Sequence, residues 1–316
     1  HGTPTVILLM RGRKPVGESV RAVMGIRGEP TPPEDPARGL VWTEIVGLVD
    51  REDGKGQFVS VSDVERERFA KHPWSLGGGG AAELRSSLEE AAAVRLRDEI
   101  ESIGFTSITR ADEVYFNPAP ALRRSGLSED NIIVNVEGDR VRDWGLCEPG
   151  TAVFPYTGAL EPLTPGDGPV IRFLWPHRTH LWLRKELGGD HRELGLTWFE
   201  WSRFIRGRFR TPLSITFAFV STHNHFVLDR GGKVFNRTAP VIKLSPTANE
   251  EDHLGSVGLL NSSTACFWLK QVCMNKAGSG IGRGVQDEEW ESRFEHDSGK
   301  VESFPLAPVR PLAFAR

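Results

Sequence analysis

Cysteine is scarce: the 316 residues include only Cys147, Cys266 and Cys273, and no two of them form a CxxC pair. A disulfide framework needs an even set of cysteines, and a zinc site of the finger type needs closely spaced pairs. The sequence therefore predicts neither. Unpaired thiols are typical of a reducing compartment, so we expect a cytoplasmic protein.

Long apolar runs are also missing. No stretch approaches the roughly 20 apolar residues that span a bilayer, so we expect no membrane association. In "HGTPTVILLMRGRKP" the positive charge follows the apolar run, whereas a signal peptide has it first. The segment Thr3–Met10 is continuously apolar, like a strand buried on both faces. We therefore expect the chain to be a fragment whose partner strands lie upstream.

The sequence has no strong excess of either charge. Its formal net charge is −3, which argues against a histone-like binder of nucleic acid. The charges are segregated, however. Trp201–Lys243 holds eight Lys/Arg residues and one acid, whereas Gln286–Glu302 holds seven acids and two bases. The first of these segments is where we expect a polyanion to bind.

Hydrophobic periodicity predicts a mixed α/β fold. The glycine run Leu76–Gly80 is the candidate domain boundary. One set of apolar residues after it repeats every four positions and predicts a helix with a single apolar stripe: Leu84, Leu88, Ala92, Leu96 and Ile100. Strands are expected at Gln57–Val64, Ile132–Val136 and Thr151–Phe154, and in four segments between 214 and 244, with Asp229–Gly232 as a hairpin turn.

The stretch "STHNHFVLDRGG" contains His223-Asn224-His225, the three letters that name a class of metal-dependent nucleases. On a strand, His223 and His225 would share one side, where two imidazoles could hold a metal ion. Nucleases of that class spread their three residues over two strands and a helix, and no helix with a third histidine is evident here. We therefore favour a polar strand beside a groove, with no metal, and keep the nuclease as an alternative.

The segment "WFEWSRFIRGRFR" (Trp198–Arg210) mixes five aromatic residues with four arginines. Thr197-Trp-Phe-Glu200 has the form of a capping box, which predicts that a helix starts there. On such a helix, Arg203, Arg206 and Arg210 would share one face. Three guanidinium groups on one face suit phosphates or the edge of guanine. The alternative is a core helix whose exposed side happens to be basic.

Two further motifs are weak. "GSGIGRG" (Gly278–Gly284) resembles a phosphate-binding loop but lacks the strand and the acid that would accompany it. We interpret it as a backbone-rich loop that could approach DNA with Arg283. "NPAP" (Asn117–Pro120) lacks the aromatic residue that a catalytic Asn-Pro-Pro-aromatic tetrad needs to stack on a base, so we reject it.

Several segments resemble one enzyme family. "HGTPTVILL" is similar to the last strand of the catalytic domain of γ-type N6-adenine DNA methyltransferases. Other segments resemble a TaqI-type target-recognition domain: "NVEGDRVRDWGLCEPGTAVFPY" (Asn135–Tyr156), "LGSVGLLNSSTACFWLKQ" (Leu254–Gln271) and "VESFPLAP" (Val301–Pro308). Over its whole length the chain resembles the adenine-specific methyltransferases of phage growth limitation, or BREX type 2, systems.

The resemblance implies S-adenosylmethionine as the cofactor of the parent enzyme. Neither the glycine-containing motif that binds it nor the tetrad that holds an extruded adenine occurs in these residues. We therefore expect no catalytic residue, no cofactor and no metal in this chain. Residues 1–75 would be the last strands of a Rossmann-like catalytic domain, and residues 76–316 a mixed α/β domain that recognises double-stranded DNA.

For that domain we expect phosphate contacts to set position and a few side chains to read bases. The residues predicted for phosphates are Arg203, Arg206, Arg208, Arg210 and Lys233. Those predicted nearer the bases are His223, Asn224, Arg230 and Arg283. The rival hypothesis is an interaction module whose basic segment binds acidic partners, such as a defence-system subunit or a phage protein that mimics DNA.

Overall fold

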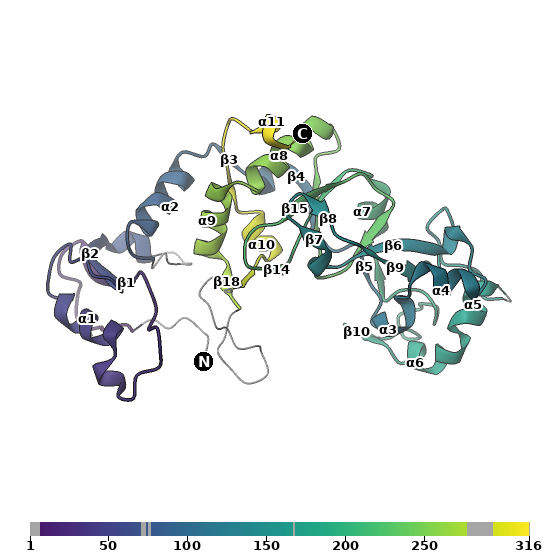
Figure 1. Cartoon of the computed structure of the whole chain (residues 1–316), viewed down its shortest axis with the longest axis horizontal. Helices are drawn as coiled ribbons and strands as arrows, with labels where there is room; N and C mark the ends of the chain where they lie inside the picture. The colour runs from purple at the N-terminus through teal and green to yellow at the C-terminus, as the bar shows by residue number, and fades with distance from the viewer. Residues whose placement is uncertain (1–6, 71–73, 75–76, 167, 277–292, 316) are drawn as a thin grey trace. The chain divides into compact units, whose positions relative to one another are not determined.

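The computed structural model describes residues 7–70, 74, 77–166, 168–276 and 293–315. Two compact units make up the chain (Figure 1). The N-terminal unit extends to Ala93 and also includes Lys270–Val272, whereas the main unit comprises Val94–Leu269 and the chain from Cys273 onward. Within the described residues, no helix is both long and apolar enough to cross a membrane.

The N-terminal unit is built on one antiparallel strand pair. β1 (Ser19–Gly25) and β2 (Val59–Glu65) pair along their whole length, and β2 confirms the strand expected at Gln57–Val64. The helices are α1 (Leu40–Leu48) and α2 (Ala81–Glu90). The described part of the strand expected at Thr3–Met10 is exposed and forms no strand. Among the described residues it has no neighbouring strand, so the expected terminal strand of a Rossmann-like domain is not confirmed.

The glycine run packs closely against this strand pair instead of forming a linker. The Gly78 N–H donates to the Gly25 carbonyl oxygen at 2.9 Å, and the Gly79 N–H donates to Ser60 Oγ at 3.1 Å. A Cβ on Gly78 would lie 2.7 Å from both the Met24 carbonyl oxygen and Ser60 Oγ, so no larger residue fits. The two compact units divide the chain at 93/94, after α2.

We predict that Gly78→Ala lowers the free energy of unfolding of the N-terminal unit by about 1–3 kcal/mol, because the new methyl group overlaps backbone that cannot move freely. Chemical denaturation measures the change. The matched control is Gly25→Ala, where a Cβ meets nothing within 4 Å. Equal stabilities of the two variants would contradict the tight packing at Gly78.

The helix expected from the four-residue repeat ends early. α2 stops at Glu90, Leu96 is fully buried in the main unit, and Ile100 begins strand β4 (Ile100–Gly104). The repeat thus runs across the boundary between two units. Burial of Leu96 and the strand pairing that begins at Ile100 override the local helical pattern.

Two small sheets organise the main unit. One has the order β15-β13-β17-β4 and the other the order β16-β6-β9. Besides β4, their strands are β6 (Ile132–Val136), β9 (Gly150–Val153), β13 (Ser214–Phe217), β15 (Phe226–Asp229), β16 (Lys233–Phe235) and β17 (Val241–Leu244). The strands expected near these positions are confirmed.

The remaining described strands are short, and α8 and α9 are the longest of the remaining α-helices. The strands are β3 (Val94–Arg95), β5 (Ser107–Ile108), β7 (Val141–Arg142), β8 (Gly145–Leu146), β10 (Lys185–Glu186), β11 (Gly189–Asp190), β12 (Arg203–Phe204), β14 (Val220–Ser221), β18 (Met274–Asn275), β19 (Phe294–Glu295) and β20 (Pro305–Leu306). The helices are α3 (Asp112–Tyr115), α4 (Ala119–Arg124), α5 (Pro169–Leu174), α6 (Arg178–Trp182), α7 (Arg206–Arg210), α8 (Glu250–Leu260), α9 (Ser263–Val272), α10 (Ser298–Val301) and α11 (Leu312–Ala315). The content of helix and strand confirms a mixed α/β fold.

Asp229–Gly232 is not a hairpin turn, contrary to expectation. β15 pairs with β13, whereas β16 pairs in parallel with β6 in the other sheet. Gly231 and Gly232 both have positive φ, 98° and 74°, which suits glycine and lets the chain pass from one sheet to the next.

β16 lies between two hydrophobic cores. Val234 belongs to the larger core, which also holds Phe154 and Trp201, whereas Phe235 belongs to a smaller core with Val227. Successive strand residues point to opposite faces, so one strand contributes to both cores.

Candidate nucleic-acid interface

The basic segment is not one helix. The capping pair forms as expected, because the Glu200 N–H donates to Thr197 Oγ1 at 3.2 Å and the Thr197 N–H donates to Glu200 Oε1 at 2.6 Å. A helix on a surface buries one stripe, but here every residue from 198 to 202 is buried. The chain therefore extends into β12, and only α7 is helical. Arg203 lies on a strand and does not share a helix face with Arg206 and Arg210, so the expected three-arginine face is wrong.

The α7 arginines largely contact the protein itself. The Arg208 guanidinium donates to the carbonyl oxygens of Ile103 and Phe105 at 2.9 and 2.8 Å, which makes it a structural residue. Arg206 Nη2 lies 3.5 Å from the Glu161 carboxylate. Arg210 is exposed and reaches only the Ala159 carbonyl oxygen, at 3.5 Å. Of the three, Arg210 remains the most available for a phosphate.

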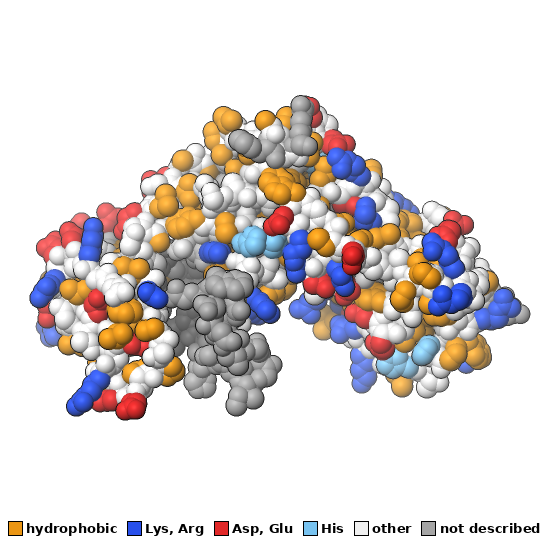
Figure 2. All heavy atoms as spheres, in the orientation of Figure 1, with side chains coloured by type: hydrophobic (Ala, Val, Ile, Leu, Met, Phe, Trp, Pro, Cys, Tyr) orange, Lys and Arg blue, Asp and Glu red, His pale blue; other side chains and the backbone are white. Residues whose placement is uncertain are grey.

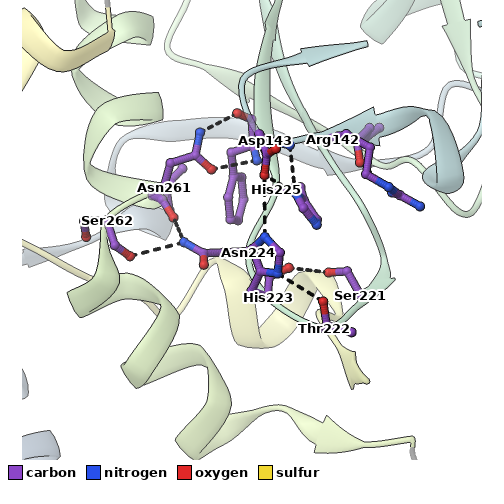
Figure 3. Close-up of polar contacts among 12 residues, drawn as sticks. Arg142, Asp143, Ser221, Thr222, His223, Asn224, His225, Asn261 and Ser262 are labelled. Carbon is purple, nitrogen blue, oxygen red and sulfur yellow. Dashed lines mark hydrogen bonds and ion pairs between the residues drawn. The ribbon is translucent and has the colours of Figure 1, made fainter. Parts of the chain in front are cut away.

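Asn224 is not placed for base contact. The triplet lies in the loop between β14 and β15, not on a strand, and Asn224 is buried with its amide directed away from the two histidines (Figure 3). Its Nδ2 donates to the carbonyl oxygens of Leu260 and Ser262 at 2.5 and 3.3 Å. Satisfying these buried carbonyls fixes the loop against the end of α8, which is a structural role.

The other predicted contact residues differ in their surroundings. Arg230 is exposed but paired with Glu250 at 2.6 Å, and Lys233 is paired with Asp229 at 2.6 Å. His223 is exposed, and its ring centroid lies 4.1 Å from that of the buried His225. Arg283, in "GSGIGRG", lies outside the described residues.

The positions of the histidines do not match those of a metal-dependent nuclease, the alternative that the His-Asn-His triplet left open. The helix that comes next in sequence, α8, does contain a histidine, His253. That side chain is buried, and its Nδ1 bonds to the Asn249 carbonyl oxygen of its own helix at 2.7 Å. It therefore has no part in a site with His223 and His225.

Arg203 belongs to a different cluster, centred on Glu186. The Glu186 side chain is only 4% exposed, and its two oxygens bind Arg110 at 2.6 Å and Arg203 at 2.7 Å. Burial alone would raise the pKa of Glu186, but the two guanidinium groups outweigh it and hold the pKa below its usual range. Two positive charges against one negative charge leave a net positive charge on two half-exposed arginines.

Lys185 adds a further positive charge beside this cluster. It precedes Glu186 on β10, is exposed, and makes no ion pair among the described residues. We call Arg110, Lys185 and Arg203 the β10 surface. Arg110 also has a left-handed φ of 60°, which is uncommon for a residue with a side chain and often marks functional positions.

A buried network holds the β10 surface in place. Arg184 is 4% exposed, and its guanidinium donates to four carbonyl oxygens at 2.6–2.9 Å: those of Thr109, Leu181, Trp198 and Glu200. These carbonyls flank Arg110, Lys185 and Arg203 in the chain. Strands β5 and β12 also pair directly, with Arg203 opposite Ile108. The three cations are therefore carried by segments that one buried guanidinium joins.

His191 completes this network from the β11 side. It is fully buried, its Nδ1 lies 3.0 Å from the Thr197 carbonyl oxygen, and its Nε2 lies 2.9 Å from Ser202 Oγ. The carbonyl requires the proton on Nδ1, so Nε2 accepts from the serine. Burial lowers the pKa of His191, so the ring stays neutral in the fold.

We predict that the free energy of unfolding decreases as the pH falls from 7 to 5. The folded-state pKa of His191 is below its unfolded value of ~6.5, so the unfolded chain takes up a proton that the folded chain does not. The stabilisation is present above that value and is lost below it. Denaturation at several pH values measures this slope. His191→Asn should reduce this slope but not abolish it, because burial also lowers the pKa of His225. His180→Ala, at an exposed histidine, should leave the slope unchanged. Equal slopes in the two variants would contradict the assignment.

Sequence reasoning missed most of this surface. The segment from Gly168 to Lys185 contains no acidic residue. This absence of acids is a sequence signal for a basic surface, and it lies outside the basic segment Trp201–Lys243. On it, Trp175 is exposed, and the Arg178 guanidinium lies over its ring at 4.9 Å. Figure 2 shows Lys, Arg and His side chains over the region that α4, α5 and α6 occupy in Figure 1, with some acidic side chains among them.

Comparisons place the chain among known proteins. No protein-family model matches it. Among solved structures, it resembles the type IIL restriction-modification enzyme MmeI in complex with DNA (TM-score 0.40, 14% identity, 68% of this chain and 25% of that chain). It also resembles the type IIG restriction endonuclease BpuSI (TM-score 0.46, 8% identity, 92% and 33%). Both TM-scores are too low to carry an argument.

The sequence match is much stronger. The chain is 40% identical over 319 aligned residues to the adenine-specific methyltransferase PglX of Streptomyces coelicolor, and the match covers 98% of this chain and 26% of that protein. The resemblance read from the sequence is thereby confirmed. The chain is a relative of the adenine-specific methyltransferase PglX, and it spans about a quarter of that protein's length.

Proposed function

We propose that the main unit binds double-stranded DNA as the target-recognition domain of a PglX-like, adenine-specific DNA methyltransferase that acts in defence against phages. The match to PglX over 98% of the chain carries this proposal. The β10 surface supports it, because exposed guanidinium and ammonium groups with a net positive charge suit the phosphate backbone. Arg210, His223 and Arg230 are the other predicted contacts that remain exposed, and Arg230 is paired with Glu250.

The methyl transfer itself would require residues outside this chain. S-adenosylmethionine would be bound by the glycine-containing motif of the parent enzyme, and the extruded adenine by its tetrad. Neither motif occurs in these 316 residues. The role of this chain would be to place the target sequence, in the cytoplasm, where a methyltransferase meets phage DNA.

The N-terminal unit would be part of the catalytic domain, as the sequence predicts for residues 1–75. Its helix α1 supports this. The helix is strongly apolar, yet none of its residues is buried, and Leu40, Trp42 and Val46 are all exposed. Exposed large apolar side chains on one helix are typical of a surface that a partner covers. The occupant that we propose is the remainder of the methyltransferase.

Selection from a random duplex pool tests target recognition. The chain should enrich one short motif, because a recognition domain loses about 1–3 kcal/mol for each mismatched base pair. Binding without enrichment would show that the chain holds only the backbone, and it would overturn the recognition role. Measuring the pool at low salt keeps weak complexes detectable.

The second candidate function is a protein-interaction module, and the exposed face of α1 favours it. In that case α1 or the β10 surface would bind a defence-system subunit or an acidic phage protein. A chain that binds such a protein but no duplex at any salt concentration would support this alternative.

A further inference from the structure

One cluster in the main unit shares no residue with the β10 surface. Asp143 lies at the turn between β7 and β8, and it approaches His223 and His225 in the loop between β14 and β15 (Figure 3). One ligand atom from each residue lies within 4.8 Å of the others. Asp143 Oδ1 is 3.5 Å from His223 Nε2 and 3.5 Å from His225 Nδ1.

The two distances from the Asp143 carboxylate are close to those between ligands of one metal ion. Zn²⁺ binds histidine nitrogens and carboxylate oxygens at about 2.0–2.1 Å in tetrahedral geometry, which places ligand atoms roughly 3.3–3.4 Å apart. The carboxylate oxygen therefore lies at nearly the right distance from both nitrogens. Asp143 also has a left-handed φ of 47°, which places its side chain and its backbone N–H on the side of the histidines.

His223 presents a lone pair toward the carboxylate. Its Nδ1 lies 3.0 Å from Thr222 Oγ1, so a proton on Nδ1 can be donated to that hydroxyl. The neutral ring then has its lone pair on Nε2, the atom that faces Asp143. Metal-bound histidines commonly use such a second hydrogen bond to fix the tautomer and the ring orientation.

His225 also directs a lone pair into the cluster. Its Nδ1 accepts the Asp143 backbone N–H at 2.8 Å, so this nitrogen carries no proton. An ion would displace one hydrogen bond, and the released N–H belongs to an exposed turn where water can replace it.

We propose that Asp143, His223 and His225 form a binding site for a divalent transition-metal ion of the Zn²⁺ type. Two imidazoles and one carboxylate are ligands that Zn²⁺ prefers, and three protein ligands leave a fourth position for water. The ion would join the β7–β8 turn to the β14–β15 loop. None of its ligands belongs to the β10 surface, and only His223 is also a predicted DNA contact.

The sequence predicted no metal because it offered only the two histidines. Asp143 is about eighty residues earlier in the chain, and only the fold brings it to them. The sequence predicted that His223 and His225 would point to the same side of a strand. They do so although they lie in a loop, whereas Asn224 points away from them (Figure 3).

Isothermal titration of the chelator-treated chain with ZnCl₂ tests the proposal, and metal analysis of the dialysed protein gives the stoichiometry. We expect one equivalent of Zn²⁺, with affinity reduced at least 10-fold by His223→Ala and by Asp143→Asn. Both residues are exposed, so neither variant should compromise folding. The matched control is His180→Ala, which removes a similarly exposed histidine that lies 3.2 Å from the Glu113 carboxylate. This variant should bind Zn²⁺ as the unmodified chain does.

Titration with Co²⁺ separates this site from the exposed thiol of Cys147. A cysteine ligand would produce a thiolate charge-transfer band, and we expect none. The proposal is overturned if the chain binds no Zn²⁺, if His223→Ala and Asp143→Asn bind it unchanged, or if the thiolate band appears and disappears with Cys147→Ser.

Discussion

Replacing Arg184 by methionine should lower the free energy of unfolding of the main unit by about 3 kcal/mol or more. The substitution keeps much of the side-chain volume and removes a buried positive charge, which by itself is favourable. It also leaves four buried carbonyl oxygens without the guanidinium donor, namely those of Thr109, Leu181, Trp198 and Glu200. Each unsatisfied acceptor costs about 1–3 kcal/mol, so the loss outweighs the gain.

Chemical denaturation followed by far-ultraviolet circular dichroism measures this change. The control is Arg203→Met, which removes the same group from a half-exposed position and leaves Glu186 paired with Arg110. Arg203 is half-exposed, and the buried Glu186 carboxylate keeps its bond to Arg110, so the control should lose much less stability than Arg184→Met. If the two variants were equally stable, Arg184 would not join the segments that carry the β10 surface.

The double substitution of Lys185→Gln with Arg203→Gln should reduce the affinity for duplex DNA at least about 10-fold at low salt, which corresponds to ~1.4 kcal/mol. The variant loses two cations of the β10 surface but keeps the Arg110–Glu186 pair, so the buried carboxylate stays neutralised. The dependence of log K on log salt concentration should become shallower by about 2, because roughly one counterion is released for each phosphate contact.

The matched control is the double substitution of Arg123→Gln with Arg140→Gln. It changes the net charge by the same amount, but each of these arginines lies beside an exposed acid, Glu129 or Asp139, and neither belongs to the β10 surface. Fluorescence anisotropy with a labelled duplex compares the two. If both double variants lost affinity equally, overall charge rather than the β10 surface would account for binding.

Strand positions were predictable where alternation and β-branched residues coincide. Ile132–Val136 forms β6 as expected, and the segments between 214 and 244 form β13, β15, β16 and β17. Their pairing was not predictable, because β16 leaves its sequence neighbour β15 for a strand about a hundred residues earlier. Local turn residues such as Gly231 and Gly232 indicate that the chain turns, but not which sheet it enters next.

The predicted helices were wrong where neighbouring residues differ in burial from what a helix allows. The repeat from Leu84 to Ile100 follows a helical spacing, but Leu96 is buried in a different unit and Ile100 begins a strand there. The capping pair at Thr197 and Glu200 formed without a helix, because the aromatic residues around Trp198 had to enter the core in succession. Local signals describe one turn of chain, and long-range packing decides whether a helix continues from it.

The candidate site could likewise be predicted only in part from the sequence. The sequence singled out Arg203, which the structure places on a net positive surface, but it gave a helix face as the reason. Arg110 and Lys185 come from segments that no motif marks, and the fold joins them through Arg184 and Glu186. A charge count cannot separate Arg208, whose guanidinium binds backbone carbonyls, from an arginine that faces solvent.

The most direct test of DNA recognition by this chain is its affinity for a random-sequence duplex, measured by fluorescence anisotropy between about 50 and 200 mM salt. Contacts from Arg110, Lys185, Arg203 and Arg210 would neutralise up to four phosphates, so log K should fall against log salt concentration with a slope of roughly −3 to −4. A slope near zero, or no binding at 50 mM salt, would contradict the proposal that the main unit docks on the DNA backbone.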